Sequence, residues 1–158
     1  MYPIIRTVRA DLRIAAPAFL ALPAGVAAAA LTLVGRTASS ARLRTWLTGR
    51  PGWTGGRVLS RAVLGLPLDL AAFVLIGYAL FNSVRNFGYP FWYFDTDYHG
   101  AWGGPTMAGV WTVHALGWLA CLAFLLHWPV RWLAKGQRAL DHRLTTAGFR
   151  SQAIGPGR

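Results

Sequence analysis

Apolar residues fill two long stretches of the chain, residues 62–83 and 106–130. Pro67 and Asp69 interrupt the first stretch, and the second carries no acidic residue, lysine or arginine. A helix needs about 20 apolar residues to cross a bilayer. The pattern therefore predicts two transmembrane helices that bracket residues 84–106.

A third apolar stretch, residues 14–34, is rich in alanine and contains Pro17 and Pro23. Its length suits one span, but alanine contributes little to membrane insertion and prolines weaken a helix. Three interpretations stay open: a third crossing helix, a re-entrant segment, or a helix that lies in the membrane interface. A crossing would place the N-terminal arginines outside the cell, against the positive-inside rule.

Two basic segments accompany these stretches. Residues 35–61 hold six arginines and no acid, and 38–47 could form a surface helix with Leu43, Trp46 and Leu47 on one side. Residues 131–149 are basic and predicted to be helical, with one shared face that would transmit a signal to a partner helix: Leu133, Leu140 and Leu144. The expected fold is an all-α, polytopic helical membrane domain over residues 1–149, followed by a disordered tail, 150–158.

Composition supports the membrane interpretation. Of the 158 residues, 54% are hydrophobic and 13% are charged, against about 25% charged in a soluble domain. The net charge of +11 comes almost entirely from arginine. These arginines lie beside apolar runs, where they favour anionic lipid headgroups over nucleic acid as the partner. The single cysteine, Cys121, predicts neither a disulfide nor a zinc site.

The arginines also predict an orientation. The 35–61 loop and the tail from Arg131 onward each hold six Lys or Arg, whereas the 84–106 loop holds Arg85 alone. The positive-inside rule places the first two in the cytoplasm and the 84–106 loop outside the cell. We therefore expect a multi-pass protein of the plasma membrane.

The 84–106 loop and the start of the last span carry a distinctive pattern. It reads Trp102-Gly103-Gly104-Pro105-Thr106, then Ala108-Gly109, Trp111 and Val113-His114-Ala115-Leu116, and it is preceded by Tyr89-Pro90-Phe91-Trp92-Tyr93. This pattern resembles the sensor domain found at the N-terminus of many actinobacterial histidine kinases and also as a free-standing membrane protein.

The resemblance implies a signal-input module of a two-component system. Nothing after Phe149 has room for a kinase, so we expect no catalytic output and no enzyme activity. The expected partners are the lipid bilayer, a histidine kinase or other cytoplasmic signalling protein, and a second copy of the chain. The alternative is a structural or accessory membrane protein with no sensing role.

One aspartate and two histidines stand inside the predicted spans: Asp69, His114 and His127. A carboxylate in a span costs about 2.5–3.5 kcal/mol on insertion scales and normally has a partner or a role. His127 is within reach of Asp69 from the antiparallel span, and Arg61, Arg131 or solvent near the Pro67 kink are the alternatives. His114 fits a hydrogen bond across a helix interface, with proton sensing as the second interpretation.

The external loop holds the residues expected to receive a signal: Trp92, Tyr93, Asp95, Asp97, His99 and Trp102. Its aromatic rings suit the membrane–water interface better than a ligand cage. Asp95, Asp97 and His99 alternate as metal ligands would, but the spacing is unspecific, and we expect no metal. No nucleophile–base pair or phosphate-binding loop is evident, so no cofactor is expected either.

Overall fold

The computed structural model describes residues 2–153, with side chains at residue 7 and over 9–146. Within this range every regular element is helical, as the sequence predicts. The elements in chain order are α1 (Tyr2–Leu33), α2 (Thr37–Thr48), α3 (Gly55–Phe87), α4 (Tyr89–Trp92), α5 (Met107–Leu125), the π-helical turn η1 (Leu126–Val130) and α6 (Arg131–Ala153).

Three helical stretches are long and apolar enough to cross a membrane: Arg9–Leu33, Gly55–Phe87 and Met107–Thr146. The two predicted spans lie in the second and third of these. The fold class is therefore confirmed as that of a helical, multi-pass membrane protein, and the third apolar stretch belongs to a helix of sufficient length.

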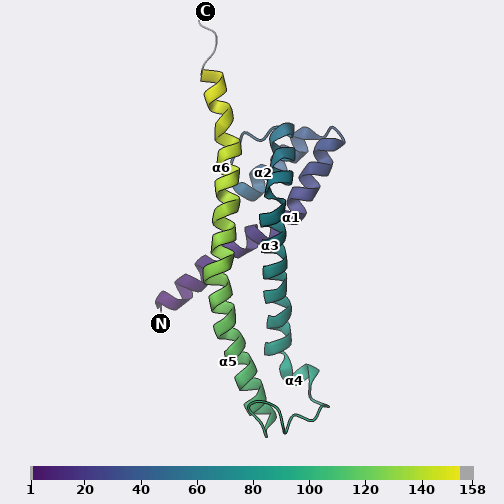
Figure 1. Ribbon diagram of the computed structural model, residues 1–158, viewed down its shortest axis with the longest axis vertical. Helices are drawn as coiled ribbons and strands as arrows, with labels where there is room; N and C mark the ends of the chain where they lie inside the picture. Colours follow the sequence, from purple (N-terminus) through teal and green to yellow (C-terminus); the bar gives the residue numbers. More distant parts are fainter. Residues whose placement is uncertain (1, 154–158) are drawn as a thin grey trace, which may run out of the picture.

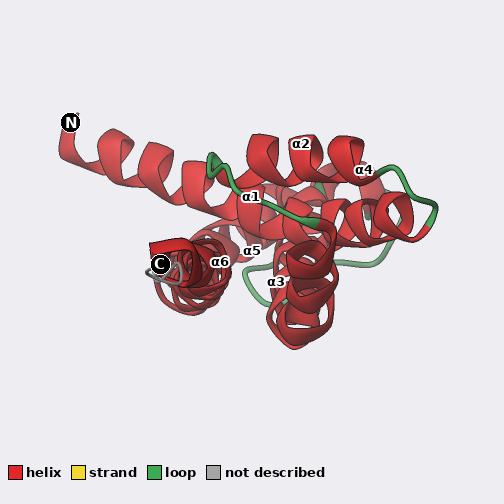
Figure 2. Cartoon of the chain, turned by 90° about the horizontal axis from the view of Figure 1, so that it is seen from above, coloured by secondary structure: helices red, strands yellow, loops and turns green. Residues whose placement is uncertain are grey.

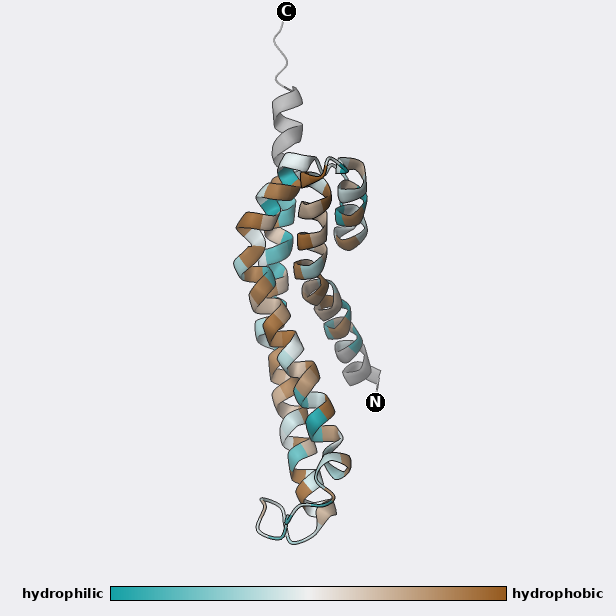
Figure 3. Ribbon diagram, turned by 90° about the vertical axis from the view of Figure 1, so that its right-hand side faces the viewer, coloured by the Kyte–Doolittle hydropathy of each residue, from teal (hydrophilic) through white to brown (hydrophobic). Residues whose placement is uncertain are grey.

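The molecule is elongated and has two halves (Figure 1). Helix α3 runs the whole length of the bundle, and α5, η1 and α6 follow one another as one long helix antiparallel to it. We call the end with α4 and α5 the hairpin half. The other end, where α1, α2 and α6 gather around the beginning of α3, is the cluster half (Figures 1 and 3).

Helix α1 changes direction along its length, and its N-terminal part points away from the rest of the bundle (Figures 1 and 2). It contains Pro17 and Pro23, and proline removes a backbone hydrogen bond inside a helix and bends it. Arg131 reaches Asp11 at 2.6 Å, and Gln137 reaches the Ala18 carbonyl at 3.3 Å. Helix α1 therefore runs in the same direction as α6, within the cluster half.

Small residues allow the helices to approach where the two halves meet. The buried core there consists of Ala15, Ala18, Ala72, Ile76, Val130 and Ala134. Close packing of small side chains is a usual way for helices to associate in a membrane. Most of α5 is instead exposed and apolar, with Val110 and Trp118 as its buried residues, as expected of a lipid-facing helix (Figure 3).

Helix α2 forms where a basic surface helix was predicted. Leu43 packs against a small core of Ala28, Trp53 and Val58, whereas Trp46 is 71% exposed. The buried residues are Ser40 and Arg44. The Ser40 hydroxyl donates to the Ala28 carbonyl at 2.8 Å, because α2 docks on α1 through polar contacts.

Helix α6 also differs from the prediction. Its buried face consists of Ala134, Gln137, Asp141 and Thr145, which recur at helical spacing. Leu133 packs against the protein's own core, and Leu140 and Leu144 are half-buried beside that face. The three leucines therefore do not form a free docking surface. The helix continues to Ala153, so residues 150–153 are helical rather than disordered, and 154–158 lie outside the described residues.

Candidate functional site

A buried pair of opposite charges lies in α3. Arg61 and Asp69 are 1% and 3% exposed. The Arg61 Nη1 and Nη2 atoms donate to the two carboxylate oxygens of Asp69 at 2.9 and 3.0 Å. This two-point geometry is the strongest form of a charge-assisted hydrogen bond between side chains. Asp69 thus pairs with Arg61, one of the alternatives from the sequence.

The same guanidinium reaches a second carboxylate on α6. Arg61 Nε donates to Asp141 at 2.5 Å, and Nη2 of Arg44 in α2 donates to the same oxygen at 3.0 Å. Asp141 is 7% exposed. One aspartate of α6 therefore connects α2 with α3.

Gln137 completes what we call the arginine–aspartate cluster: Arg44, Arg61, Asp69, Gln137 and Asp141. Its side-chain amide donates to Asp69 at 2.9 Å and to the Ala18 carbonyl at 3.3 Å. The cluster thus links α1, α2, α3 and α6. Removing one partner from a buried ion pair typically costs about 3–5 kcal/mol, because a charge is left uncompensated.

Gly65 makes room for this arrangement. It lies one helical turn after Arg61, and a Cβ atom built there would overlap the Arg61 guanidinium. The guanidinium therefore lies across the bare backbone of α3 on its way to Asp69. Any larger residue at position 65 would displace it.

Arg44 is held less completely than Arg61. Its guanidinium carbon lies 4.8 Å from the ring centre of Trp53, within range of a cation–π interaction. Its Nε is buried and has no hydrogen-bond partner among the described residues. Burial is the main cause that lowers the pKa of Arg44 below its ordinary value.

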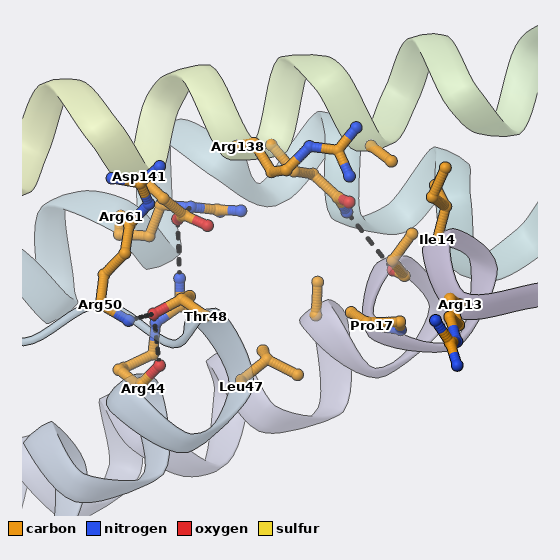
Figure 4. A pocket seen from close by; sticks show the side chains of 14 residues that line it. Arg13, Ile14, Pro17, Arg44, Leu47, Thr48, Arg50, Arg61, Arg138 and Asp141 are labelled. Carbon is orange, nitrogen blue, oxygen red and sulfur yellow. Dashed lines mark hydrogen bonds and ion pairs between the residues drawn. The ribbon is translucent and has the colours of Figure 1, made fainter. Parts of the chain in front are cut away.

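A pocket of about 220 Å³ opens beside the cluster (Figure 4). Helices α1, α2, α3 and α6 contribute to its wall. The wall combines apolar side chains such as Pro17 and Leu47 with five arginines and a single acid. These charged residues are Arg13, Arg44, Arg50, Arg61, Arg138 and Asp141.

The predicted pairing of Asp69 with His127 is wrong. The His127 Nδ1 atom instead lies 3.9 Å from a carboxylate oxygen of Asp11. Asp11 is the main partner of Arg131, at 2.6 Å. Helix α1 places Asp11 beside η1 and the start of α6, where Asp11 lies close to both His127 and Arg131. Asp69 pairs instead with Arg61, which belongs to the same helix, α3.

Glycines shape the loop at residues 84–106. Gly103 has a φ of +97°, a conformation that favours glycine. A Cβ on Gly109 would overlap the Gly103 carbonyl oxygen, so the loop packs directly on the first turn of α5. Thr106 caps that turn by accepting from the Gly109 N–H at 3.1 Å, which places Pro105 just before the helix rather than in its first turn.

Ring stacking connects the loop with α5. Tyr93 stacks on Tyr89 at 4.5 Å between ring centres, and Tyr89 stacks on His114 at 4.7 Å. The other His114 contact is local, since its Nδ1 lies 2.8 Å from the Val110 carbonyl. Trp92 and Trp102 are 61% and 84% exposed. The predicted receiving residues are therefore mostly open to the surroundings.

The acidic residues of the loop do not form a metal site. Asp97 contacts His99 through the His99 backbone N–H at 3.1 Å and the ring Nδ1 at 3.0 Å. Asp95 does not join them, and no group of three or more potential ligands occurs in the described part of the chain. The His99 backbone N–H is the main cause that holds the pKa of Asp97 below its ordinary value.

Three residues of the cluster were not predicted from the sequence: Arg44, Gln137 and Asp141. A signal for them was present. The chain has five acidic residues, all aspartates, against 16 Lys and Arg, so a lone Asp141 in a basic helix is unusual. Its spacing from Ala134 and Gln137 also follows a helical face.

Comparisons with protein-family models, curated proteins and solved structures found no match to this chain.

Proposed function

We propose that the chain is a membrane-embedded signal-input protein that couples its external loop to its cluster half. The supporting observation is the uninterrupted helix formed by α5, η1 and α6, from Met107 to Ala153. Its first turns carry His114, which stacks on the loop through Tyr89. Its later turns carry Gln137 and Asp141. A rotation or shift of this helix would reach both ends of the molecule.

The junction between the halves has a special geometry. The π-helical turn η1 contains Pro129, and π-turns inside α-helices occur often at functional sites. Val130, the last residue of this turn, and Ala134, in the first turn of α6, pack into the central core. Two arrangements of the cluster, differing in the position of α6, would be the two states of the switch. A ligand shifts such an equilibrium only if it prefers one state.

The orientation is part of the proposal. Trp111 and Trp132 are exposed and lie about 20 residues apart on one helix, a distance of about 30 Å. This matches the hydrocarbon thickness of a bilayer, whose two interfaces favour tryptophan. The hairpin half would then cross the membrane, with the external loop outside and the arginine-rich cluster half at the cytoplasmic face.

This placement also resolves the problem of the N-terminal arginines. Asp11 lies level with Arg131, and from there α1 follows α6 away from the hairpin half. Helix α1 would therefore begin at the cytoplasmic interface and stay on that side. A cytoplasmic signalling protein, such as a histidine kinase, would contact the exposed face of α6, which includes Trp132, Lys135, Arg138 and His142.

The test combines a fluorescent reporter in the cluster half with an amino-acid substitution in the 84–106 loop. An environment-sensitive fluorophore is attached to Ala139→Cys, an exposed position of α6, in a Cys121→Ser background. Tyr89→Ala removes the stack on His114. In the reconstituted protein we expect this change to shift the reporter's emission spectrum.

Phe94→Ala is the matched control, because Phe94 lies in the same loop and is 74% exposed. If Tyr89→Ala and Phe94→Ala leave the reporter equally unchanged in folded protein, the coupling fails, and the chain is better described as a structural or accessory membrane protein. Deleting residues 131–158 would not be a clean test, because Ala134, Gln137 and Asp141 belong to the buried interior.

A further inference from the structure

The pocket beside the arginine–aspartate cluster has an excess of positive charge that the protein does not neutralise. Of its five arginines, Arg44 and Arg61 pair with aspartates of the cluster. The other three, Arg13, Arg50 and Arg138, have no acidic partner among the described side chains. They come from α1, the α2–α3 connection and α6, and they line different parts of the same pocket (Figure 4).

A second observation concerns the environment of Arg44, which lines the pocket. Arg44 is 1% exposed, and its Nε is a buried donor without a partner. An unsatisfied buried donor is unusual in a folded protein and calls for an explanation. An anion in the pocket would supply negative charge next to this residue. The same negative charge would raise the pKa of Arg44, against the lowering that burial causes.

The shape and lining narrow the class of anion. The cavity of about 220 Å³ is larger than a monatomic ion needs, and Ile14, Pro17 and Leu47 form an apolar part of its wall. Guanidinium groups match the oxygens of phosphate and carry their charge at any physiological pH. Uncharged substrates would leave the arginines uncompensated.

We propose that this pocket binds the phosphate group of an anionic ligand, with the apolar wall accommodating the organic part. A phospholipid headgroup and a soluble phosphate compound share this chemistry. Binding at this site does not depend on the proposed signalling role.

The test uses the full chain, purified in a non-ionic detergent at physiological ionic strength. Isothermal calorimetry measures the binding of inorganic phosphate in one arm and of a short-chain phosphatidylglycerol in the other. Binding of phosphatidylglycerol alone would identify a lipid headgroup as the ligand, and binding of inorganic phosphate would identify a soluble source. Either result supports a phosphate site.

The variant Arg13→Gln/Arg138→Gln removes two exposed arginines from the pocket wall. We expect its dissociation constant for the bound ligand to rise at least about tenfold, since two charge-assisted contacts are lost. Arg36→Gln/Arg42→Gln removes the same charge from exposed positions outside the pocket and should change the constant less than about twofold. No binding in either arm, or equal weakening by the two variants, would overturn the proposal.

Discussion

Three aspartates in the cluster half and two in the 84–106 loop have opposite environments. Asp11, Asp69 and Asp141 are 7%, 3% and 7% exposed, and each pairs with at least one arginine. Asp95 and Asp97 are exposed in the loop. In a chain with so few acids, those within helices are buried and neutralise arginines, whereas those in the loop contribute little to stability.

The two regions are therefore held together by different forces. The cluster half depends on buried ion pairs that link α2, α3 and α6, and on a buried hydrogen bond from Gln137 to α1. The loop depends on stacked rings and on close backbone contacts at Gly103 and Gly109. Substitutions of charged residues should consequently have large effects on the first region and small effects on the second.

The largest effect is expected for Arg61→Gln. Both Asp69 and Asp141 would lose a buried cationic partner, at a cost of about 3–5 kcal/mol in the free energy of unfolding. Chemical denaturation of the detergent-solubilised protein measures this change. Arg57→Gln, in the same helix but bonded only to the Gly52 carbonyl, serves as the control, and equal losses for both variants would refute the special role of Arg61.

Gly65→Ala should come next. The added methyl group would overlap the Arg61 guanidinium and force it away from Asp69, costing about 1–3 kcal/mol. Gly77→Ala is the matched control in the same helix, because its Cβ would meet only Phe19 at 3.9 Å. That variant should be neutral or stabilising by up to about 1 kcal/mol, since alanine favours helix. A fully stable Gly65→Ala would contradict the observed path of Arg61.

A smaller effect is expected at the contact between α1 and α6. Asp11→Asn weakens the ion pair with Arg131, whose side chain is 29% exposed, so that water screens the loss. The expected cost is about 1–2 kcal/mol. His127→Gln should change stability by less than about 0.5 kcal/mol, because His127 is 3.9 Å from Asp11 and half-exposed. A larger loss of stability for His127→Gln than for Asp11→Asn would contradict the conclusion that the Asp11–Arg131 pair is the main contact at this place.

The smallest effect concerns Asp97. NMR titration should find its pKa below that of an unfolded aspartate. The resulting contribution to folding is present above the unfolded pKa and is lost as the pH falls through the folded pKa. His99→Ala should leave the pKa still lowered, because the backbone N–H of residue 99 is the main cause. An ordinary pKa in that variant would assign the effect to the imidazole ring.

Much of the fold follows from the hydrophobic pattern. The two predicted spans lie in α3 and in α5 with η1, because long apolar runs have few alternatives in a membrane protein. The sequence also identified Asp69 correctly as a residue in need of a partner. It did not distinguish Arg61 from His127 as the partner of Asp69. The outcome depends on where α1 packs against η1, because that contact places Asp11 beside His127.

The rest of the site depends on tertiary contacts. Gln137 and Asp141 face the cluster only because α6 continues η1 without a break, a feature that helical periodicity alone does not establish. The hydrophobic pattern predicted a face of α6 formed by Leu133, Leu140 and Leu144, whereas the buried face of this helix is mainly polar. Around a buried ion pair, polar side chains occupy positions that leucine occupies in a soluble core.

The central claim is that the Arg61–Asp69 pair acts as one unit in holding the cluster half together. A double-mutant cycle with Arg61→Met and Asp69→Leu tests it directly, by measuring the free energy of unfolding of both single variants and the double variant. We predict that the double variant loses at least about 1.5 kcal/mol less than the sum of the two single losses, because neither charge remains to be compensated by the other. The same cycle with Asp69→Leu and His127→Gln should be additive. Additive losses for Arg61 and Asp69 would contradict the claim.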